Sequence, residues 1–108
     1  MDKELDLRFS DGQLRQVVEE AFVYTCACPA QVAEQILKLR ALHSYQMNCI
    51  DRGPLSEETH RLIAAATLRA HADLETCLHD ILTLEGWDMV TLTMPTGLRE
   101  VREKDISA

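Results

Sequence analysis

The chain has 108 residues, which is enough for one hydrophobic core, so we expect a single helical domain over 1–108. Its composition, 46% hydrophobic and 27% charged, is typical of a folded globular protein and excludes a disordered chain. The net charge of −7 argues against nucleic acid as a partner, because binding phosphates needs a concentrated positive surface.

Residues 1–9 are expected to form an extended N-terminal arm. Leu5, Leu7 and Phe9 alternate with polar residues, which is the spacing of a short strand. The arm lacks the basic start and apolar stretch of a signal peptide, and the longest wholly apolar run, 63–66, is too short for a membrane span. We therefore expect a cytoplasmic protein with no membrane contact, whose four cysteines are reduced thiols.

The first helix is predicted from about Asp11 to Tyr24. Ser10 followed three residues later by Gln13 is a capping-box pattern, and apolar residues then recur at helical spacing. Pro29 suits the first turn of a second helix, which makes Cys28 its predicted N-cap.

The second helix is predicted from Pro29 to about Asp51, and Gly53-Pro54 supplies its stop signal. The third is predicted from the capping residue Ser56 to Leu84, before Gly86. Each carries an apolar stripe that we expect to face the core. The stripe of the second helix comprises Val32, Ile36, Leu39, His43, Met47 and Ile50. The stripe of the third comprises Ile63, Ala66, Ala70, Leu74, Cys77, Ile81 and Leu84.

The short link at 52–55 predicts that these two helices form a long antiparallel hairpin. The fold class is therefore mainly α, a three-helix core built on this hairpin. One shorter helix leaves part of the hairpin uncovered, so we expect a homo-oligomer, with a dimer as the first expectation, or another protein partner.

Residues 87–108 are expected to form a short C-terminal β-hairpin or an extended tail. Val90, Leu92 and Met94 alternate with threonines, and the turn at 95–97 would fold 98–101 back as a second strand.

The most specific chemical motif is Cys26-Ala27-Cys28-Pro29, with two thiols at the start of a helix. In the antiparallel hairpin, this motif and the pair Cys77 and His79 lie at the same end. Three thiols and one imidazole suit zinc or another thiophilic metal, and two neighbouring thiols can also act as a redox pair. The alternative is that the cysteines are small packing residues and that the protein has no cofactor.

The remaining histidines are interpreted as structural. His43 lies on the apolar stripe of the second helix, which favours a buried, hydrogen-bonded residue over a ligand or proton carrier. His71 and Glu75 lie on one face of the third helix but lack the Glu-x-x-His spacing of a di-iron site, which favours a solvated face. Cys49 and His60 are predicted neighbours at the other end of the hairpin, and two ligands make only a weak site.

No catalytic template is present: the sequence lacks a nucleophile elbow, a phosphate-binding glycine loop, a dinucleotide fingerprint and an H-E-x-x-H motif. We therefore expect an accessory or regulatory interaction protein that self-associates, rather than an enzyme. The alternative is a thiol-based metal-binding or redox protein that uses Cys26 and Cys28.

Overall fold

The computed structural model describes residues 5–21, 28–49 and 54–95, with side chains described from residue 57 in the last range. Three helices make up the regular structure of these residues: α1 (Asp11–Ala21), α2 (Cys28–Cys49) and α3 (Pro54–Glu85). The prediction of a mainly α fold is confirmed. The helix ends predicted at 22–24 and 50–51, and Cys26, lie outside the described residues.

The predicted signals mark the beginning of α1 and the end of α3. The Ser10 N–H donates to Gln13 Oε1 at 2.8 Å, and the Gln13 N–H donates to Ser10 Oγ at 3.0 Å, which is a complete capping box. Gly86 ends α3 with a φ of 78°, which glycine adopts without strain. The N–H of Gly86 donates to the Thr83 carbonyl and that of Trp87 to the Leu82 carbonyl, the pattern of a Schellman motif.

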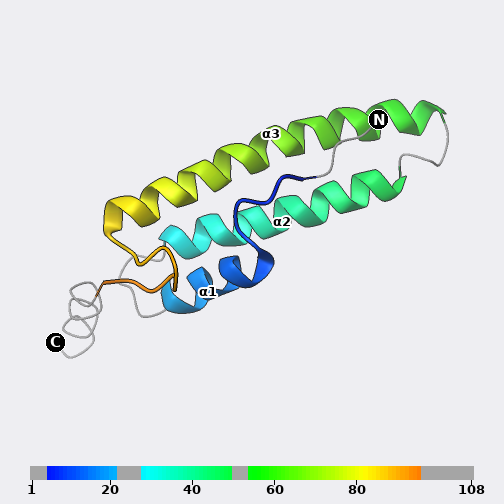
Figure 1. The fold of residues 1–108 in the computed structure, drawn as a ribbon. Helices are drawn as coiled ribbons and strands as arrows, with labels where there is room; N and C mark the ends of the chain where they lie inside the picture. Colours follow the sequence, from blue (N-terminus) through cyan, green and yellow to red (C-terminus); the bar gives the residue numbers. More distant parts are fainter. Residues whose placement is uncertain (1–4, 22–27, 50–53, 96–108) are drawn as a thin grey trace.

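Helices α2 and α3 lie side by side as the predicted antiparallel hairpin, and α1 packs beside the N-terminal half of α2 (Figure 1). Side-chain hydrogen bonds join Gln46 to His60 and Arg40 to His71 across the hairpin. Both pairs fit the antiparallel arrangement predicted from the short link at 52–55. At the end that holds α1, the N-terminal segment and residues 86–95 complete the packing.

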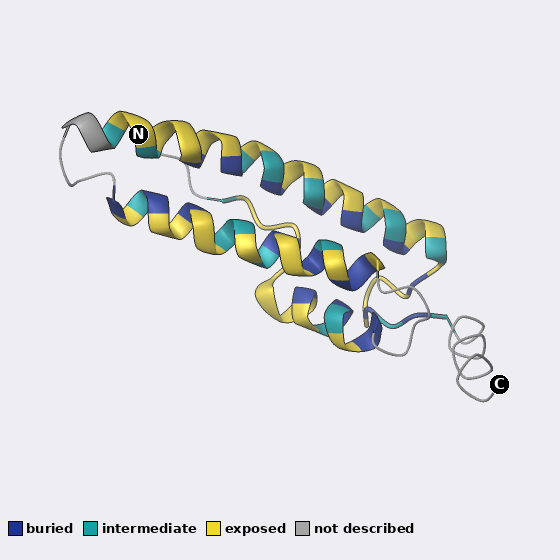
Figure 2. Cartoon of the chain, turned by 180° about the vertical axis from the view of Figure 1, so that it is seen from behind, coloured by how far each residue is buried: buried dark blue, intermediate teal, exposed yellow. Residues whose placement is uncertain are grey.

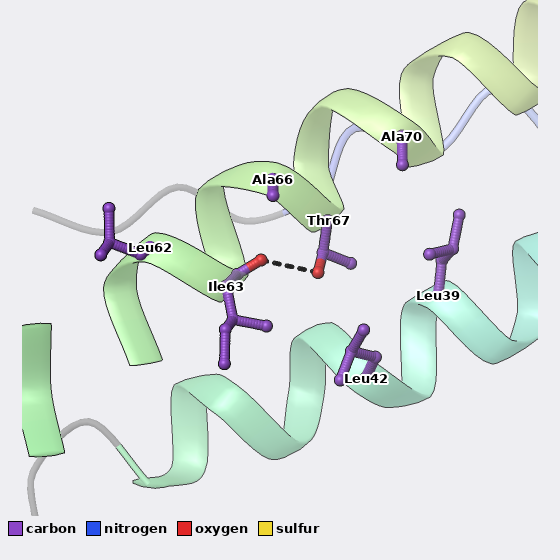
Figure 3. A pocket seen from close by; sticks show the side chains of 7 residues that line it. All are labelled: Leu39, Leu42, Leu62, Ile63, Ala66, Thr67 and Ala70. Atoms are coloured by element: carbon purple, nitrogen blue, oxygen red, sulfur yellow. Dashed lines mark hydrogen bonds between the residues drawn. The ribbon is translucent and has the colours of Figure 1, made fainter. Parts of the chain in front are cut away.

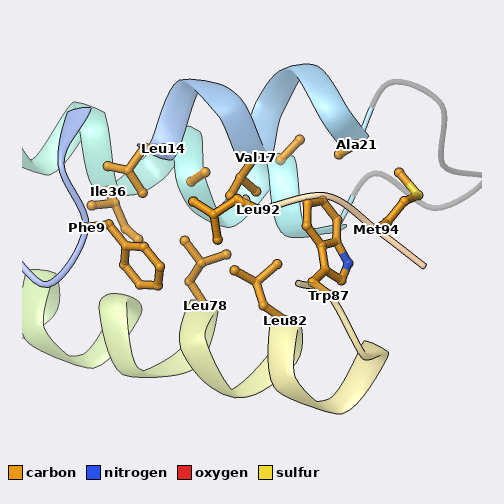
Figure 4. Close-up of a cluster of buried hydrophobic side chains, with 12 residues drawn as sticks. Phe9, Leu14, Val17, Ala21, Ile36, Leu78, Leu82, Trp87, Leu92 and Met94 are labelled. Carbon is orange, nitrogen blue, oxygen red and sulfur yellow. The ribbon is translucent and has the colours of Figure 1, made fainter. Parts of the chain in front are cut away.

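The hydrophobic core lies at this end of the hairpin (Figure 4). Side chains from all three helices are excluded from water, and Phe9, Trp87 and Met94 close the cluster from the flanking segments. The residues with no exposed surface are Leu14, Val17, Ala33, Ile36, Leu78 and Leu82. Figure 2 shows exposed residues along the outer surfaces of both long helices.

The predicted core stripe of α3 is wrong by one residue. Ile63 is 36% exposed and Leu84 is 85% exposed, and Cys77 also lies at the surface. A buried position follows each of the first six predicted ones, which turns the centre of the core face by about 100°, and predicted Leu74 and Ile81 stay half-buried at its edge. The buried positions are Ala64, Thr67, His71, Glu75, Leu78 and Leu82.

The physical reason is that the protein supplies partners for polar side chains inside the core. The Thr67 hydroxyl donates to the Ile63 carbonyl at 2.7 Å, and His71 and Glu75 bind groups from other segments. On α2 the prediction was closer. Ile36 and His43 are buried, and Val32, Leu39 and Met47 are half-buried, whereas Ile50 lies outside the described residues.

The strand predicted over 90–94 is also wrong, because residues 88–93 form a tight turn. Asp88 Oδ1 accepts hydrogen bonds from the backbone N–H groups of Val90 and Thr91, at 2.8 and 2.9 Å. Leu92 has a φ of 56°, and one isolated bridge joins Asp88 to Thr93. The N-terminal segment likewise forms no strand within residues 5–9. The predicted return strand at 98–101 lies outside the described residues.

We expect Leu82→Ala to lower the free energy of unfolding by about 2–5 kcal/mol, because it opens a cavity in the core. Leu84→Ala should change it by less than about 0.5 kcal/mol, because that side chain is already in water. Urea unfolding of both variants tests the corrected core face, and a larger loss for Leu84→Ala would contradict it.

Candidate functional site

Arg40 is the centre of a buried charge cluster between α2, α3 and the N-terminal strap, by which we mean residues 5–10. Its side chain is 10% exposed, and all three of its guanidinium nitrogens have partners. Nε–H donates to His71 Nε2 at 2.9 Å, and Nη1 donates to Asp11 Oδ1 at 2.6 Å. Nη2 donates to the Phe9 carbonyl at 2.6 Å and to Glu75 Oε2 at 2.9 Å. The planar guanidinium therefore ties together both long helices, the strap and the first turn of α1.

Glu75 holds the strap from the side of α3. Its Oε2 accepts the backbone N–H groups of Arg8 and Phe9, at 2.9 and 3.1 Å, in addition to the Arg40 guanidinium. Glu20 acts similarly at the other end of the core, where its Oε1 accepts the Met94 N–H at 3.1 Å. Both glutamates are buried, so each carboxylate gives a non-helical segment the hydrogen-bond acceptor that its backbone needs.

His71 is a neutral member of the cluster. Its Nε2 accepts the Arg40 N–H, so the ring proton is on Nδ1, which faces Glu75 Oε1 at 3.6 Å. Burial lowers the pKa of His71 below the ordinary value of 6.5, and the nearby Arg40 and His43 act in the same direction. The Glu75 carboxylate opposes this shift but does not reverse it.

The prediction of a solvated face for His71 and Glu75 is therefore wrong. His71 is 1% exposed and Glu75 is 3% exposed. A signal was present in the sequence, because positions 64, 67, 71, 75, 78 and 82 have helical spacing. The series includes three polar residues, Thr67, His71 and Glu75, so it does not read as a core face. The sequence pattern cannot show that Arg40 lies across the hairpin to pair with them.

His43 is buried on α2, as predicted for a core residue, and is 7% exposed. Its Nε2 atom, however, has no hydrogen-bond partner among the described residues, which differs from the expected satisfied side chain. At the other end of the hairpin Cys49 is buried, and His60 Nδ1 binds Gln46 Oε1.

The structure brings Cys28 to the same end of the hairpin as Cys77 and His79, because the start of α2 lies beside the last turns of α3 (Figure 1). Cys28 is the first residue of α2 and is exposed, so the helix begins at the predicted N-cap residue, one position before the predicted start at Pro29. Cys77 is exposed, contrary to its predicted core position, and His79 is half-exposed beside Asp80.

No three His, Cys, Asp or Glu side chains in the described ranges are grouped to hold a metal ion. The metal site predicted at Cys26, Cys28, Cys77 and His79 includes a residue outside those ranges and stays a prediction.

An apolar groove of about 390 Å³ lies between α2 and α3, away from α1 (Figure 3). Its lining residues are Leu39, Leu42, Leu62, Ile63, Ala66, Thr67 and Ala70. Ala70 directly precedes His71, which places it about 100° around α3 from the charge cluster. In Figure 3 the strap passes behind α3, so the groove opens on the opposite face of the hairpin from the strap.

Comparison of the chain with protein families, with curated proteins and with solved structures gives no match. Within the described ranges, none of the helices has the length and apolar character needed to cross a membrane. The candidate site therefore has to be interpreted from its own geometry. The charge cluster positions the strap, and the groove offers an apolar surface.

Lowering the pH below about 6.5 should destabilise the protein. His71 binds its proton more weakly in the folded state, so the unfolded state takes up protons first and is favoured by acid. The stability that the protein gains from a neutral, buried His71 is fully present above pH ~6.5. It is lost as the pH falls through the lowered pKa of His71.

We expect His71→Gln to reduce this pH dependence, measured by urea unfolding between pH 7.5 and 5.5. The half-exposed His79, replaced by Gln, is the matched control and should retain the wild-type slope. An unchanged slope in His71→Gln would contradict the assignment of a neutral, buried His71.

Cys77 should react with iodoacetamide before Cys49 in the native protein, because Cys77 is exposed and Cys49 is buried. Mass spectrometry of labelled peptides measures the order, and faster labelling of Cys49 would contradict the burial assigned here. Repeating the labelling after chelation tests the thiol hypothesis, because a bound metal would protect Cys77 until it is removed.

Proposed function

We propose that this chain is a small helical accessory or regulatory protein that acts by binding protein surfaces, and that it self-associates. The observation that carries the proposal is the apolar stripe of α3 that the chain leaves uncovered. Ile63 is 36% exposed and Leu84 is 85% exposed, and Leu74 and Ile81 between them are only half-buried, packed in part against the core.

This stripe and the α2–α3 groove form one surface, which we call the apolar face: the groove residues together with Leu74, Cys77, Ile81 and Leu84 of α3. A helical repeat of apolar residues over a 32-residue helix is typical of a packing surface. Contiguous exposed apolar surface of this kind marks sites of protein association. The face supports a partner of the same character, an amphipathic helix.

The opposite face of the hairpin is closed. The strap is held there by Glu75 and Arg40, and α1 packs beside α2. These contacts leave the apolar face open, so a partner can approach without displacing any described segment. The burial of each leucine side chain would contribute about 1.5–3 kcal/mol to association.

The two alanines of the groove favour a helix as the partner. Ala66 is exposed and Ala70 is half-buried, and both lie within the groove. Small residues let two helix backbones approach closely and leave room for larger side chains of the opposing helix. We place this function in the cytoplasm, an assignment supported by the free thiols of Cys49 and Cys77.

Sedimentation velocity at ~100 μM tests the proposal, because a complex with micromolar affinity is largely assembled at that concentration. The wild-type chain should sediment as a dimer or higher oligomer. Leu62→Glu should weaken the association at least tenfold, because it places a charge in the buried surface.

Leu7→Glu is the matched control, since Leu7 is 56% exposed but lies in the strap on the opposite face. It should associate like the wild type. A monomeric wild-type chain, or equal weakening by both substitutions, would overturn the proposal.

A further inference from the structure

We infer that His71, Arg40 and the strap form a pH-sensitive switch, in which protonation of the His71 imidazole releases the strap while the three helices stay folded. The switch lies on the closed face of the hairpin, so the inference does not depend on the proposed function of the apolar face. It rests on the hydrogen bonds that connect the imidazole to the strap through one guanidinium.

The bond between His71 and Arg40 exists only while the imidazole is neutral. His71 Nε2 accepts the Arg40 Nε–H at 2.9 Å through its lone pair, which is the position that an added proton takes. Both ring nitrogens of an imidazolium are donors, and an arginine side chain keeps its protons. Protonation therefore sets two N–H groups against each other, and the ring and the guanidinium have to separate.

This separation reaches the strap through the other nitrogens of the same guanidinium. Nη2 of Arg40 donates to the Phe9 carbonyl at 2.6 Å, and Nη1 donates to Asp11 Oδ1 at 2.6 Å. The guanidinium is planar and rigid, so Nε cannot move away without moving both Nη atoms. The strap then loses the donor that holds it to α2, and the first turn of α1 loses its ion pair.

The charges of the cluster favour the same change. While His71 is neutral, the charge of Arg40 is balanced by Glu75 and Asp11. A proton on His71 places a second cation against Arg40, and nearby His43 of α2 adds to the repulsion when it is charged. The Glu75 carboxylate faces His71 Nδ1 at 3.6 Å and becomes the counter-ion of the imidazolium, which weakens its pairing with Arg40.

The strap faces this cluster with backbone groups rather than with charges. The N–H groups of Arg8 and Phe9 bind Glu75. The Asp6 side chain is exposed, and the Arg8 guanidinium donates to the Thr76 hydroxyl at the surface, at 3.4 Å. The charges that determine the response to pH therefore belong to the helices.

Release of the strap exposes less apolar surface than unfolding of the helices. Phe9 is the strap residue in the buried hydrophobic cluster, whereas all three helices contribute several side chains to it. Segments with few buried contacts open at a lower free-energy cost than the core elements of the same protein. The strap therefore opens before the helices unfold.

Amide hydrogen exchange and ring titration, both measured by NMR on the full chain, test the inference. The N–H groups of Arg8 and Phe9 report on the strap, and that of Leu78 reports on unfolding of α3. The ring nitrogens of His71 report on its protonation. Because burial lowers the pKa of His71, the measurement runs from about pH 7.5 to well below 6.5.

Protection of the two strap amides, corrected for the intrinsic pH dependence of exchange, should fall at least about tenfold as His71 takes up its proton. The Leu78 amide should keep its protection over that range. The Met94 N–H is an internal control for protonation of carboxylates, because buried Glu20 accepts it as Glu75 accepts the strap, and it should also stay protected. Equal loss at Met94 would assign the effect to carboxylates and overturn the inference.

His71→Gln is the decisive variant, because its amide oxygen can accept the Arg40 N–H but does not titrate. Its strap amides should stay protected at the pH at which the wild type releases them, and His79→Gln, changed at a half-exposed position, should behave like the wild type. Release of the strap in His71→Gln at that pH, or loss of Leu78 protection together with the strap, contradicts the switch. If His71→Gln does not fold, the wild type decides alone: strap exchange that follows the ring titration supports the switch, and a strap that stays protected after His71 is protonated overturns it.

Discussion

The burial of the Arg40 guanidinium is the constraint on which the rest of the structure depends. A buried charge is costly unless its donors are paired, and here α3, α1 and the strap supply the acceptors. Glu75 in turn pairs the backbone of the strap. Removal of either charge would leave its partner buried and uncompensated, which is more costly than the loss of a surface ion pair.

The same constraint determines which surface of α3 remains open. Because His71 and Glu75 face the interior with Arg40, the apolar stripe that begins at Ile63 lies at the edge of the core, with Ile63, Cys77 and Leu84 exposed and Leu74 and Ile81 half-buried. The orientation of α3 about its own axis therefore decides both which polar residues are buried and which apolar residues are exposed.

The helices themselves were predictable because their signals are local. Ser10 and Gln13 cap α1, and Gly86 ends α3 in the left-handed conformation that its lack of a Cβ permits. The short connection after α2 predicted the antiparallel hairpin. The segment after α3 was less predictable: the turn at Asp88 replaces a strand that alternation alone had indicated, because the Asp88 carboxylate binds two backbone N–H groups.

The sequence by itself determined the helical class, the start of α1, the end of α3 and the presence of an apolar stripe, since each depends on residues within a few turns of one another. Only the tertiary structure decided that this stripe faces outward and that His71 and Glu75 face inward. The reason is that Arg40 and Glu75 are distant in the chain and meet only when the hairpin forms. Helical periodicity records where apolar residues lie on a helix, and the partners available across the fold decide which side is buried.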